Sequence, residues 1–379
     1  MIVGNIDTKD ISVVVQGGID QKYTSDCLKS IRKHLPDSEI ILSTWEGSDA
    51  DGLDYDIIIF NKKIEKNFID NEVLNLVNNT NRQIISTQNG IKKASKKYIL
   101  KLRTDSLLLN NNFLKYFDKF QNRNKKYIGF KNRVIVPSVY AREYSNDIKL
   151  CLTFHPSDFY FFGLEEDIKD YLLDVELLKD NELSGFYFKY NNLVPSKNFT
   201  WIYAPEQYIC TSWAIKRFNN IHFHDWSDIN YKNYKDSLNI LYNNFTFLDL
   251  EQSGITNTKH SWAFENSDKI DGLITYRRFL QRYYELCSND DNSEENNYDE
   301  QAFYINNITG YIDFQTNNIN NQMNNINNTI NNYLMNNNRK NIFTILGDFI
   351  FSIKYLQGKK IITLFGFKIT TKSSNKYSI

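Results

Sequence analysis

The stretch KYILKLRTDSLLL, residues 97–109, decides how the first part of this sequence folds. Its apolar residues lead to Arg103, Thr104 and Asp105, after which the sequence becomes apolar again. Short apolar runs bounded by polar residues are typical of a buried strand. A carboxylate at the end of such a strand loses hydration, which is costly unless the charge is paired. Arg103, two residues before Asp105, is the partner that the sequence itself offers.

Strands and helices alternate in the residues around this stretch. Short runs at 11–16, 39–45 and 55–61 predict strands, and amphipathic spacing predicts helices over 21–34 and around 81–97. This alternation predicts an α/β fold with a mostly parallel, Rossmann-like sheet. Ligands bind beyond the carboxyl ends of the strands in such sheets. Polar residues that follow the predicted strands are therefore expected along one edge: Gln16, Gly17, Gly18, Thr44, Trp45, Arg103, Thr104 and Asp105.

The middle of the chain, residues 127–285, is less regular. A helix is predicted over 205–218, because Pro205 is tolerated in a first turn, and another over 270–287. Short strands are predicted at KYIGF (126–130), RVIVP (133–137) and SDFYFFG (157–163).

Composition excludes several classes of protein. The chain has 379 residues, and its 45 basic and 45 acidic side chains give a formal net charge of zero, which argues against nucleic acid as the partner. We find no signal peptide at the N-terminus and no apolar stretch of ~18 residues that would span a membrane. The cysteines have neither disulfide-framework nor zinc-site spacing and are expected to be cytoplasmic thiols in the core: Cys27, Cys151, Cys210 and Cys287.

Two segments follow the first domain, which we expect to span residues 1–287. Residues 288–303 have the acidic, polar composition of a linker. Residues 304–338 are rich in Asn, yet their apolar positions follow the a/d heptad of a coiled coil, which predicts a homo-oligomer. A disordered spacer with chance spacing is the alternative. The residues at one heptad position recur every seven residues: Ile305, Ile312, Ile319, Ile326 and Tyr333. The residues at the other position each follow four residues later: Thr309, Thr316, Met323 and Ile330.

Residues 339–379 form a tail with eight Lys or Arg side chains and one acid. Apolar residues between 342 and 356 recur at helical spacing, which predicts a basic amphipathic helix that binds an anionic membrane surface. Packing of this helix on its own domain is the alternative. Residues 359–372 predict a short hairpin around Gly366. The tail would hold the protein at the inner face of the cytoplasmic membrane.

Four further clusters of polar residues lie near the ends of predicted elements. Each has a plain structural interpretation beside a functional one. Glu206 is a favourable charge for a helix N-terminus, and Asp158 can cap a turn. His222 and His224 can be buried packing residues, because a single His-x-His pair is a weak metal signal. The clusters lie in NRQIIST (81–87), HPSDFYFFG (155–163), APEQYICTSW (204–213) and HFHDW (222–226).

Several of these stretches together resemble the WavE family, which is associated with bacterial lipopolysaccharide core and surface polysaccharide synthesis. The family looks similar to GT-A glycosyltransferases, so the resemblance implies a GT-A domain that transfers a sugar from a nucleotide sugar to a lipid-linked or oligosaccharide acceptor. It covers roughly residues 10–285 and rests on ISVVVQG (11–17), SIRKHLPDSEIILSTWEG (30–47), NRQIISTQNGIKKASKKYILKLRTDS (81–106), SDFYFFG (157–163) and PEQYI (205–209).

The resemblance also implies roles for single residues. A D-x-D motif holds Mn²⁺ or Mg²⁺ in GT-A enzymes; here Thr104-Asp105-Ser106 offers one carboxylate, with His224 as the expected second ligand. Glu206 is the expected catalytic base, ahead of Asp158, because a helix N-terminus should lower its pKa. The residues expected to bind the donor are Gln16, Gly17, Trp45, Arg82, Gln83, Arg103, Thr104 and Asp105.

Two other functions compete with glycosyl transfer. A nucleotidyl- or phosphosugar-transferase would usually carry a Gly-rich phosphate loop with Arg and Lys, but QGGIDQKY (16–23) has only Lys22. A non-catalytic glycan-binding scaffold would suit the many Tyr and Trp residues. That interpretation gives no reason for Asp105, Asp158 and Glu206 to gather at the ends of strands and helices.

Overall fold

The computed structural model describes residues 1–64, 67–69, 76–145, 150–179, 203–219, 221–225, 228 and 230–287, the helical residues 303, 312, 316, 319–320 and 323–331, and three strands between 351 and 372. The chain divides into two compact units, Met1–Ile312 and Asp313–Ile379, which are described separately. No helix in the described residues is long and apolar enough to cross a membrane.

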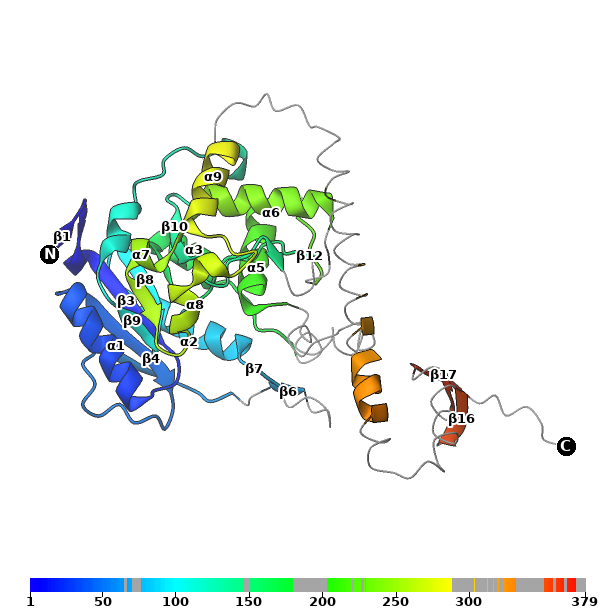
Figure 1. Ribbon diagram of the computed structural model, residues 1–379. Helices are drawn as coiled ribbons and strands as arrows, with labels where there is room; N and C mark the ends of the chain where they lie inside the picture. The colour runs from blue at the N-terminus through cyan, green and yellow to red at the C-terminus, as the bar shows by residue number, and fades with distance from the viewer. Residues whose placement is uncertain are drawn as a thin grey trace. The chain divides into compact units, whose positions relative to one another are not determined.

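A seven-stranded sheet with the order β14-β10-β13-β8-β3-β4-β5 forms the centre of the first unit (Figure 1). Strand β3 pairs in parallel with β4 and β8, β4 with β5, and β10 with β14. Only β13 is antiparallel to its neighbours in this sheet. The predicted α/β fold with a mostly parallel sheet is confirmed. The strands are β3 (Ile11–Gln16), β4 (Glu39–Trp45), β5 (Ile57–Asn61), β8 (Tyr98–Arg103), β10 (Val134–Pro137), β13 (Phe161–Leu164) and β14 (Phe245–Leu248).

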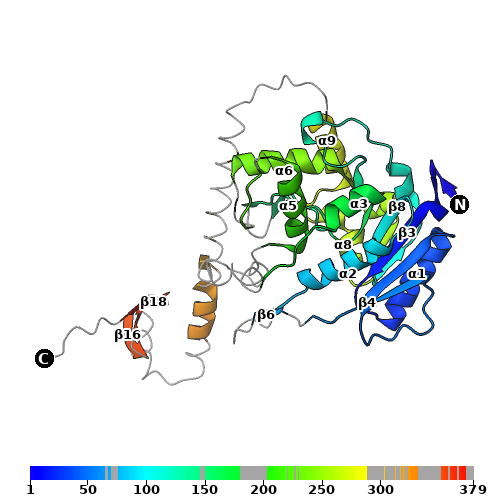
Figure 2. The same cartoon turned by 180° about the vertical axis from the view of Figure 1, so that it is seen from behind.

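Helices cover both faces of this sheet, and side chains that alternate along each strand fill two apolar cores (Figures 1 and 2). Val13 and Val15 pack with α1, whereas Val14 packs on the opposite face with α2. The helices are α1 (Gln21–His34), α2 (Thr80–Lys93), α3 (Glu165–Leu172), α5 (Pro205–Arg217), α6 (Tyr231–Asn244), α7 (Leu250–Ser253), α8 (Ser261–Glu265) and α9 (Tyr276–Leu286).

Short elements complete the first unit. Strands β9 (Ser106–Leu108) and β15 (Ile255–Asn257) form an antiparallel pair directly after β8. The other short strands are β1 (Ile2–Val3), β2 (Ile6–Asp7), β6 (Asn67–Ile69), β7 (Leu76–Asn78), β11 (Tyr144–Ser145) and β12 (Leu150–Cys151). The 3-10 helices are η1 (Thr8–Asp10), η2 (Asn112–Tyr116), η3 (Lys125–Tyr127) and η5 (Ser267–Lys269).

The strand predicted at 126–130 is wrong. Residues Lys125–Tyr127 form η3, whose N-cap side chain accepts from the Lys126 N–H. The N–H groups of Gly129 and Phe130 both donate to Oδ1 of Asn244, so a side chain takes the donors that a strand would need. Of the other two strands predicted in this region, 133–137 is confirmed as β10, and 157–163 shortens to β13.

Three of the four cysteines are buried, as predicted, and Cys151 is half-buried; all four are free thiols.

The tail of the second unit contains an antiparallel sheet of β16 (Phe351–Leu356), β17 (Lys359–Leu364) and β18 (Phe367–Lys372). The hairpin predicted around Gly366 is confirmed, because Leu364 pairs with Phe367. The predicted amphipathic helix is wrong over residues 351–356, and its earlier part, 342–350, lies outside the described residues. Apolar and polar residues alternate in FSIKYL, so the same stretch also fits the period of a strand.

The described residues of the Asn-rich segment are helical. Phe303, the last residue of the predicted linker, stacks on Tyr234 of α6 with the ring centroids 4.9 Å apart. Further along, Ile319 and Met323, four residues apart, remain about half exposed (49% and 56%). A helical backbone agrees with the heptad prediction. The association of several such helices stays a prediction.

We expect Ile319→Asn combined with Ile326→Asn to convert a homo-oligomer of the full-length chain to monomers. Both positions belong to the heptad, and polar residues there remove the apolar seam that a coiled coil needs. Light scattering on the purified protein measures the mass. Asn320→Ser, at an exposed neighbouring position, should leave the mass unchanged. A wild-type chain with the mass of one copy would contradict the prediction.

Gly90 sets the distance between α2 and the sheet. A Cβ atom at this position would lie 2.3 Å from Cγ1 of Val14 and 3.3 Å from Cβ of Ser43. We therefore expect Gly90→Ala to lower the free energy of unfolding by about 1–3 kcal/mol through overpacking, measured by urea titration. Gly18→Ala is the matched control, because nothing lies within 4 Å of a Cβ there. Equal midpoints for the two variants would contradict the prediction.

Candidate functional site

The carboxyl ends of β3, β4 and β8 lie side by side, because these strands are parallel neighbours. Gln16 pairs with Arg103 in the register of the sheet, and the main-chain N–H of Thr104 donates to the carbonyl of Gln16 at 3.1 Å. Gly17 has φ +132°, and a Cβ there would lie 3.0 Å from Oγ1 of Thr104. Thr104 in turn donates to the carbonyl of Gly18 at 2.8 Å. This tight turn therefore needs glycine at position 17.

Asp105 is buried at this edge and is held by a fork of two hydrogen bonds. Arg103 Nε donates to Oδ1 at 2.9 Å and Arg103 Nη2 to Oδ2 at 3.0 Å. Nδ2 of Asn257 donates to Oδ1 at 2.7 Å, and Nζ of Lys259 lies 3.6 Å from Oδ2. Burial alone would raise the pKa of Asp105, but Arg103, Asn257 and Lys259 outweigh it and hold this pKa below its usual value. The carboxylate is therefore ionised and paired.

The residues Asn257–His260 are functional candidates that the sequence did not reveal. Strand β15 pairs with β9, and this places Asn257 opposite Ser106, next to Asp105. His260 follows, with its ring 5.3 Å from that of Phe159. Burial and the nearby Arg103 charge lower the pKa of His260. The segment NTKH lacks any periodic signal, and the pairing spans about 150 residues of sequence.

Arg82 and Trp45 form a second cationic feature at the same edge. The guanidinium of Arg82, in the first turn of α2, lies 4.7 Å from the centre of the Trp45 ring at the end of β4. Such a cation–π contact orients the guanidinium without using all of its donors. The Nε atom of Arg82 is buried and has no hydrogen-bond partner. This donor is therefore unsatisfied within the described part of the protein, although solvent does not reach it.

Asp158 lies on the turn that precedes β13. Its Oδ2 accepts from Nε2 of Gln83 at 2.8 Å, and its main-chain carbonyl accepts from Nζ of Lys101 at 2.6 Å. The Asp158 charge contributes to the pKa shifts of Lys101, Arg103 and Glu206. The structure therefore brings Gln83 and Asp158 together, and places Asp158 near Glu206 as well as near the Arg103–Asp105 pair.

Glu206 lies in the first turn of α5 and faces His155. Its Oε1 is 3.5 Å from Nε2 of His155, and Nδ1 of His155 is 3.1 Å from the main-chain carbonyl of Tyr140. A carbonyl only accepts hydrogen bonds, so we assign the proton of a neutral His155 to Nδ1. Nε2 then faces a protonated Glu206, whose Oε1 lies 3.5 Å away.

The pKa shifts of this pair agree with that assignment. Burial and the charge of Asp158 raise the pKa of Glu206 to about 8, and burial lowers the pKa of His155 to about 4. The expectation that the helix N-terminus keeps the pKa of Glu206 low is wrong. Loss of hydration and a neighbouring negative charge outweigh the partial charge of a helix end here.

Two residues beside His155 have left-handed backbone conformations that aromatic side chains rarely adopt. Tyr140, whose carbonyl contacts His155, has φ +63°, and Phe154, which precedes His155, has φ +53°. The N–H of Phe154 donates to Oγ of Ser237 at 2.6 Å. Such conformations cost of order 1–3 kcal/mol each and concentrate at functional sites. The surrounding contacts therefore hold the backbone around His155 in a strained conformation.

His224 is not brought to Asp105 by any contact in the described part of the chain. Both His222 and His224 are exposed, so their interpretation as buried packing residues is wrong. The main-chain N–H of His224 donates to Asp228 at 3.3 Å. No group of three or more His, Cys, Asp or Glu side chains that could hold a metal ion occurs in the described residues. A metal ligand at His224 stays a prediction.

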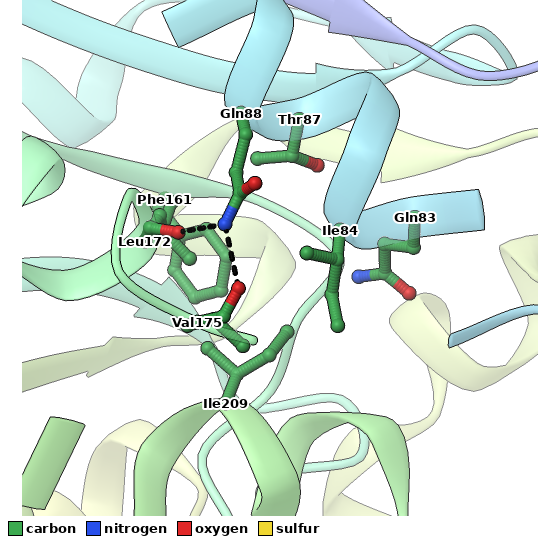
Figure 3. Close-up of a pocket in the computed structure, with 8 residues that line it drawn as sticks. All are labelled: Gln83, Ile84, Thr87, Gln88, Phe161, Leu172, Val175 and Ile209. Carbon is green, nitrogen blue, oxygen red and sulfur yellow. Dashed lines mark hydrogen bonds between the residues drawn. The ribbon is translucent and has the colours of Figure 1, made fainter. Parts of the chain in front are cut away.

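Two hollows occur among the described residues, and Gln83 lines the first of them. A cavity of about 10 Å³ between α2 and α5 has room for roughly one water molecule, and Gln88 closes it by donating to the carbonyls of Leu172 and Val175 (Figure 3). A cleft of about 600 Å³ lies at the amino end of β8, lined by Lys97, Tyr98 and eight other residues. Neither contains Asp105, Asp158 or Glu206.

The protein is an α/β protein with a mostly parallel sheet, and charged and polar side chains gather at the carboxyl edge of that sheet. The family described as WavE lipopolysaccharide synthesis matches residues 11–313. The chain therefore belongs to the WavE lipopolysaccharide synthesis family, as the resemblance predicted.

Comparisons with curated proteins and with solved structures give no further information about the activity of the chain. No curated protein matches the chain. Among solved structures, HddC from Yersinia pseudotuberculosis complexed with GMP-PN is similar at 9% identity, with a TM-score of 0.25, over 45% of this chain and 80% of that one. A TM-score this low supports no inference about activity.

The raised pKa of Glu206 predicts a fall in stability between pH 6.5 and 8. Folded Glu206 keeps its proton up to about pH 8, whereas the unfolded group releases it near 4.5, so rising pH favours unfolding. His155 acts oppositely, but only between about 4 and 6.5. We expect the melting temperature to fall across this window in the wild type and to fall less in Glu206→Gln, measured by calorimetry.

Glu46→Gln, which removes an exposed carboxylate, is the matched control and should keep the wild-type pH dependence. A Glu206→Gln variant with that same dependence would contradict the raised pKa.

Proposed function

We propose that the chain is a glycosyltransferase that moves a sugar from a nucleotide-sugar donor to a growing surface glycan of lipopolysaccharide or capsule. The observation that carries the proposal is the clustering of cations and carboxylates at one sheet edge. The Arg103–Asp105 pair and Lys259 lie near Asp158, and Asp158 lies near Glu206. Cations can stabilise the negative charge on a leaving diphosphate, and a carboxylate can accept the proton of an acceptor hydroxyl.

The donor would bind along the ends of β3, β4 and β8. The nucleoside would approach the backbone at Gly17, where a side chain is excluded. Arg82, oriented by Trp45 and with an unsatisfied Nε, would bind a phosphate oxygen. Arg103 and Lys259 would stabilise the negative charge that grows on the diphosphate as the glycosidic bond breaks.

We propose that Asp158 is the base that accepts the proton of the acceptor hydroxyl. Glu206 is the second candidate for this role. The raised pKa of Glu206 leaves it mostly protonated at neutral pH, and a protonated carboxyl cannot act as the base. Asp158 is only half-buried, whereas the Glu206 carboxyl faces His155, with Oε1 3.5 Å from Nε2. In this arrangement Gln83 orients the Asp158 carboxylate toward the hydroxyl of the acceptor.

The residues around Asp105 do not fit a divalent metal. Both carboxylate oxygens already accept from the Arg103 guanidinium, and the Lys259 ammonium lies 3.6 Å from Oδ2. Mn²⁺ or Mg²⁺ would need free oxygen ligands and would be repelled by these two cations. We propose that fixed cations take the place that a metal ion has in other GT-A enzymes, and that Asp105 orients Arg103.

The remaining partners follow from the same proposal. The acceptor is a lipid-linked or oligosaccharide glycan, and the basic residues of the tail are proposed to hold the protein against an anionic membrane surface on the cytoplasmic side. A nucleotidyl- or phosphosugar-transferase is the second candidate, because the same cations would bind its phosphates. A nucleotidyltransferase would release pyrophosphate, and a phosphosugar-transferase acting on a UDP-, GDP- or ADP-sugar would release the nucleoside monophosphate. Sugar transfer from the same donors releases the nucleoside diphosphate.

Incubation with a panel of UDP-, GDP-, CMP- and ADP-sugars, with nucleotide release as the measurement, tests the proposal. We expect release from one donor in the presence of EDTA, and loss of nearly all release in Asp105→Asn because Arg103 loses its partner. Asp158→Asn should lower turnover by roughly 10²–10⁴-fold while donor binding persists.

Asp118→Asn is the control, because this exposed carboxylate lies at the opposite edge of the sheet. Activity that vanishes in EDTA and returns with Mn²⁺ would restore a metal at Asp105. Wild-type turnover in Asp105→Asn would refute the site.

A further inference from the structure

Lys101 is a fully buried lysine in the middle of β8, the central strand of the sheet. Its Nζ donates to the main-chain carbonyl of Asp158 at 2.6 Å and lies 5.2 Å from the centre of the Phe161 ring. Within the described residues, no carboxylate forms an ion pair with it. A buried ammonium group without an ion-pair partner is costly, so its position calls for an explanation beyond packing.

The carbonyl that Lys101 binds belongs to the turn of residues 155–158. One end of this turn carries His155, which meets Glu206, and the other carries Asp158, which meets Gln83. The strained Phe154 lies directly before the turn. Lys101 therefore supports, from inside the sheet, the backbone that places two of the candidate catalytic contacts.

We propose that Lys101 is a positioning residue that fixes the turn of residues 155–158, so that Asp158 faces the acceptor and His155 faces Glu206. Its effect on catalysis rests on the proposed glycosyl transfer, whereas its effect on the turn does not. Lys101 touches neither donor nor acceptor in this arrangement, since it has no exposed surface.

The charge of Lys101 supports the same role. Burial lowers the pKa of Lys101 to about 8, the charges of Asp158 and Asp105 oppose this shift, and that of Arg103 adds to it. The amine therefore remains mostly protonated at pH 7, where its charge strengthens the hydrogen bond to the carbonyl. Strand alternation places Lys101 and Arg103 on the same face of β8, so the positioning residue and the proposed donor cation share one strand.

A Lys101→Met substitution distinguishes positioning from simple structural support. Methionine has a similar length and no charge to desolvate, and replacement of buried charges by apolar side chains is often neutral or stabilising. We expect a melting temperature equal to or above that of the wild type. We also expect faster hydrogen exchange in peptides that cover residues 154–160, and a loss of transfer on the order of 10²-fold with donor KM little changed.

Lys97→Met is the matched control, because Lys97 is exposed just before the same strand. It should leave hydrogen exchange at 154–160 and transfer unchanged. If Lys101→Met does not fold, Lys101→Gln, which keeps a hydrogen-bond donor, takes its place in the same measurements. Slow exchange at 154–160 in a folded Lys101 variant would overturn the proposal.

The outcomes for the two proposals are separable. A wild-type protein that releases nucleotide from no donor refutes the proposed function, and hydrogen exchange still decides the role of Lys101. Active wild-type enzyme with full transfer in Lys101→Met would overturn the positioning role and leave glycosyl transfer intact.

Discussion

The pairing of Asp105 with Arg103 is the interaction on which the candidate site depends. A carboxylate that is only 4% exposed at the end of a central strand would be protonated or displaced if it stood alone. The guanidinium two residues earlier binds both of its oxygens, and Asn257 supplies a third hydrogen bond. Because Asn257 belongs to β15, this one carboxylate also fastens the β9–β15 pair to the end of the sheet.

The sequence predicted the framework of the sheet well because that part depends on local periodicity. The spans of β3, β4 and α1 agree with the structure at both ends, and α2 and β8 differ by a few residues. The Arg103–Asp105 pair was also predictable, since Asp105 follows two residues after Arg103, the last residue of β8. The strand expected at 126–130 failed because the Asn244 side chain, more than a hundred residues later, takes its N–H groups.

The parts of the site that the sequence did not reveal are set by long-range contacts. Nothing near NTKH indicates that Asn257 and Lys259 lie beside Asp105, because only the β9–β15 pairing brings them there. The predicted low pKa of Glu206 is wrong for an energetic reason. A helix N-terminus contributes typically 0.3–1 kcal/mol to a charge, whereas a single pKa unit corresponds to about 1.36 kcal/mol. Burial next to Asp158 therefore decides the protonation of Glu206.

Charge is distributed unequally between the two faces of β8 after Ile99. Along β8, Leu100 and Leu102 face the apolar core with α1, whereas Lys101 and Arg103 alternate with them and face α2. Strand β8 thus contributes apolar packing on one face and ionised groups on the other. Each ionised group on the polar face meets a specific partner: Arg103 binds Asp105, and Lys101 binds the Asp158 carbonyl. Burying ionised groups on this face costs free energy, because the groups lose hydration. Because replacement of a buried ion pair by well-packed apolar side chains is often neutral or stabilising, packing alone does not account for the Arg103–Asp105 pair.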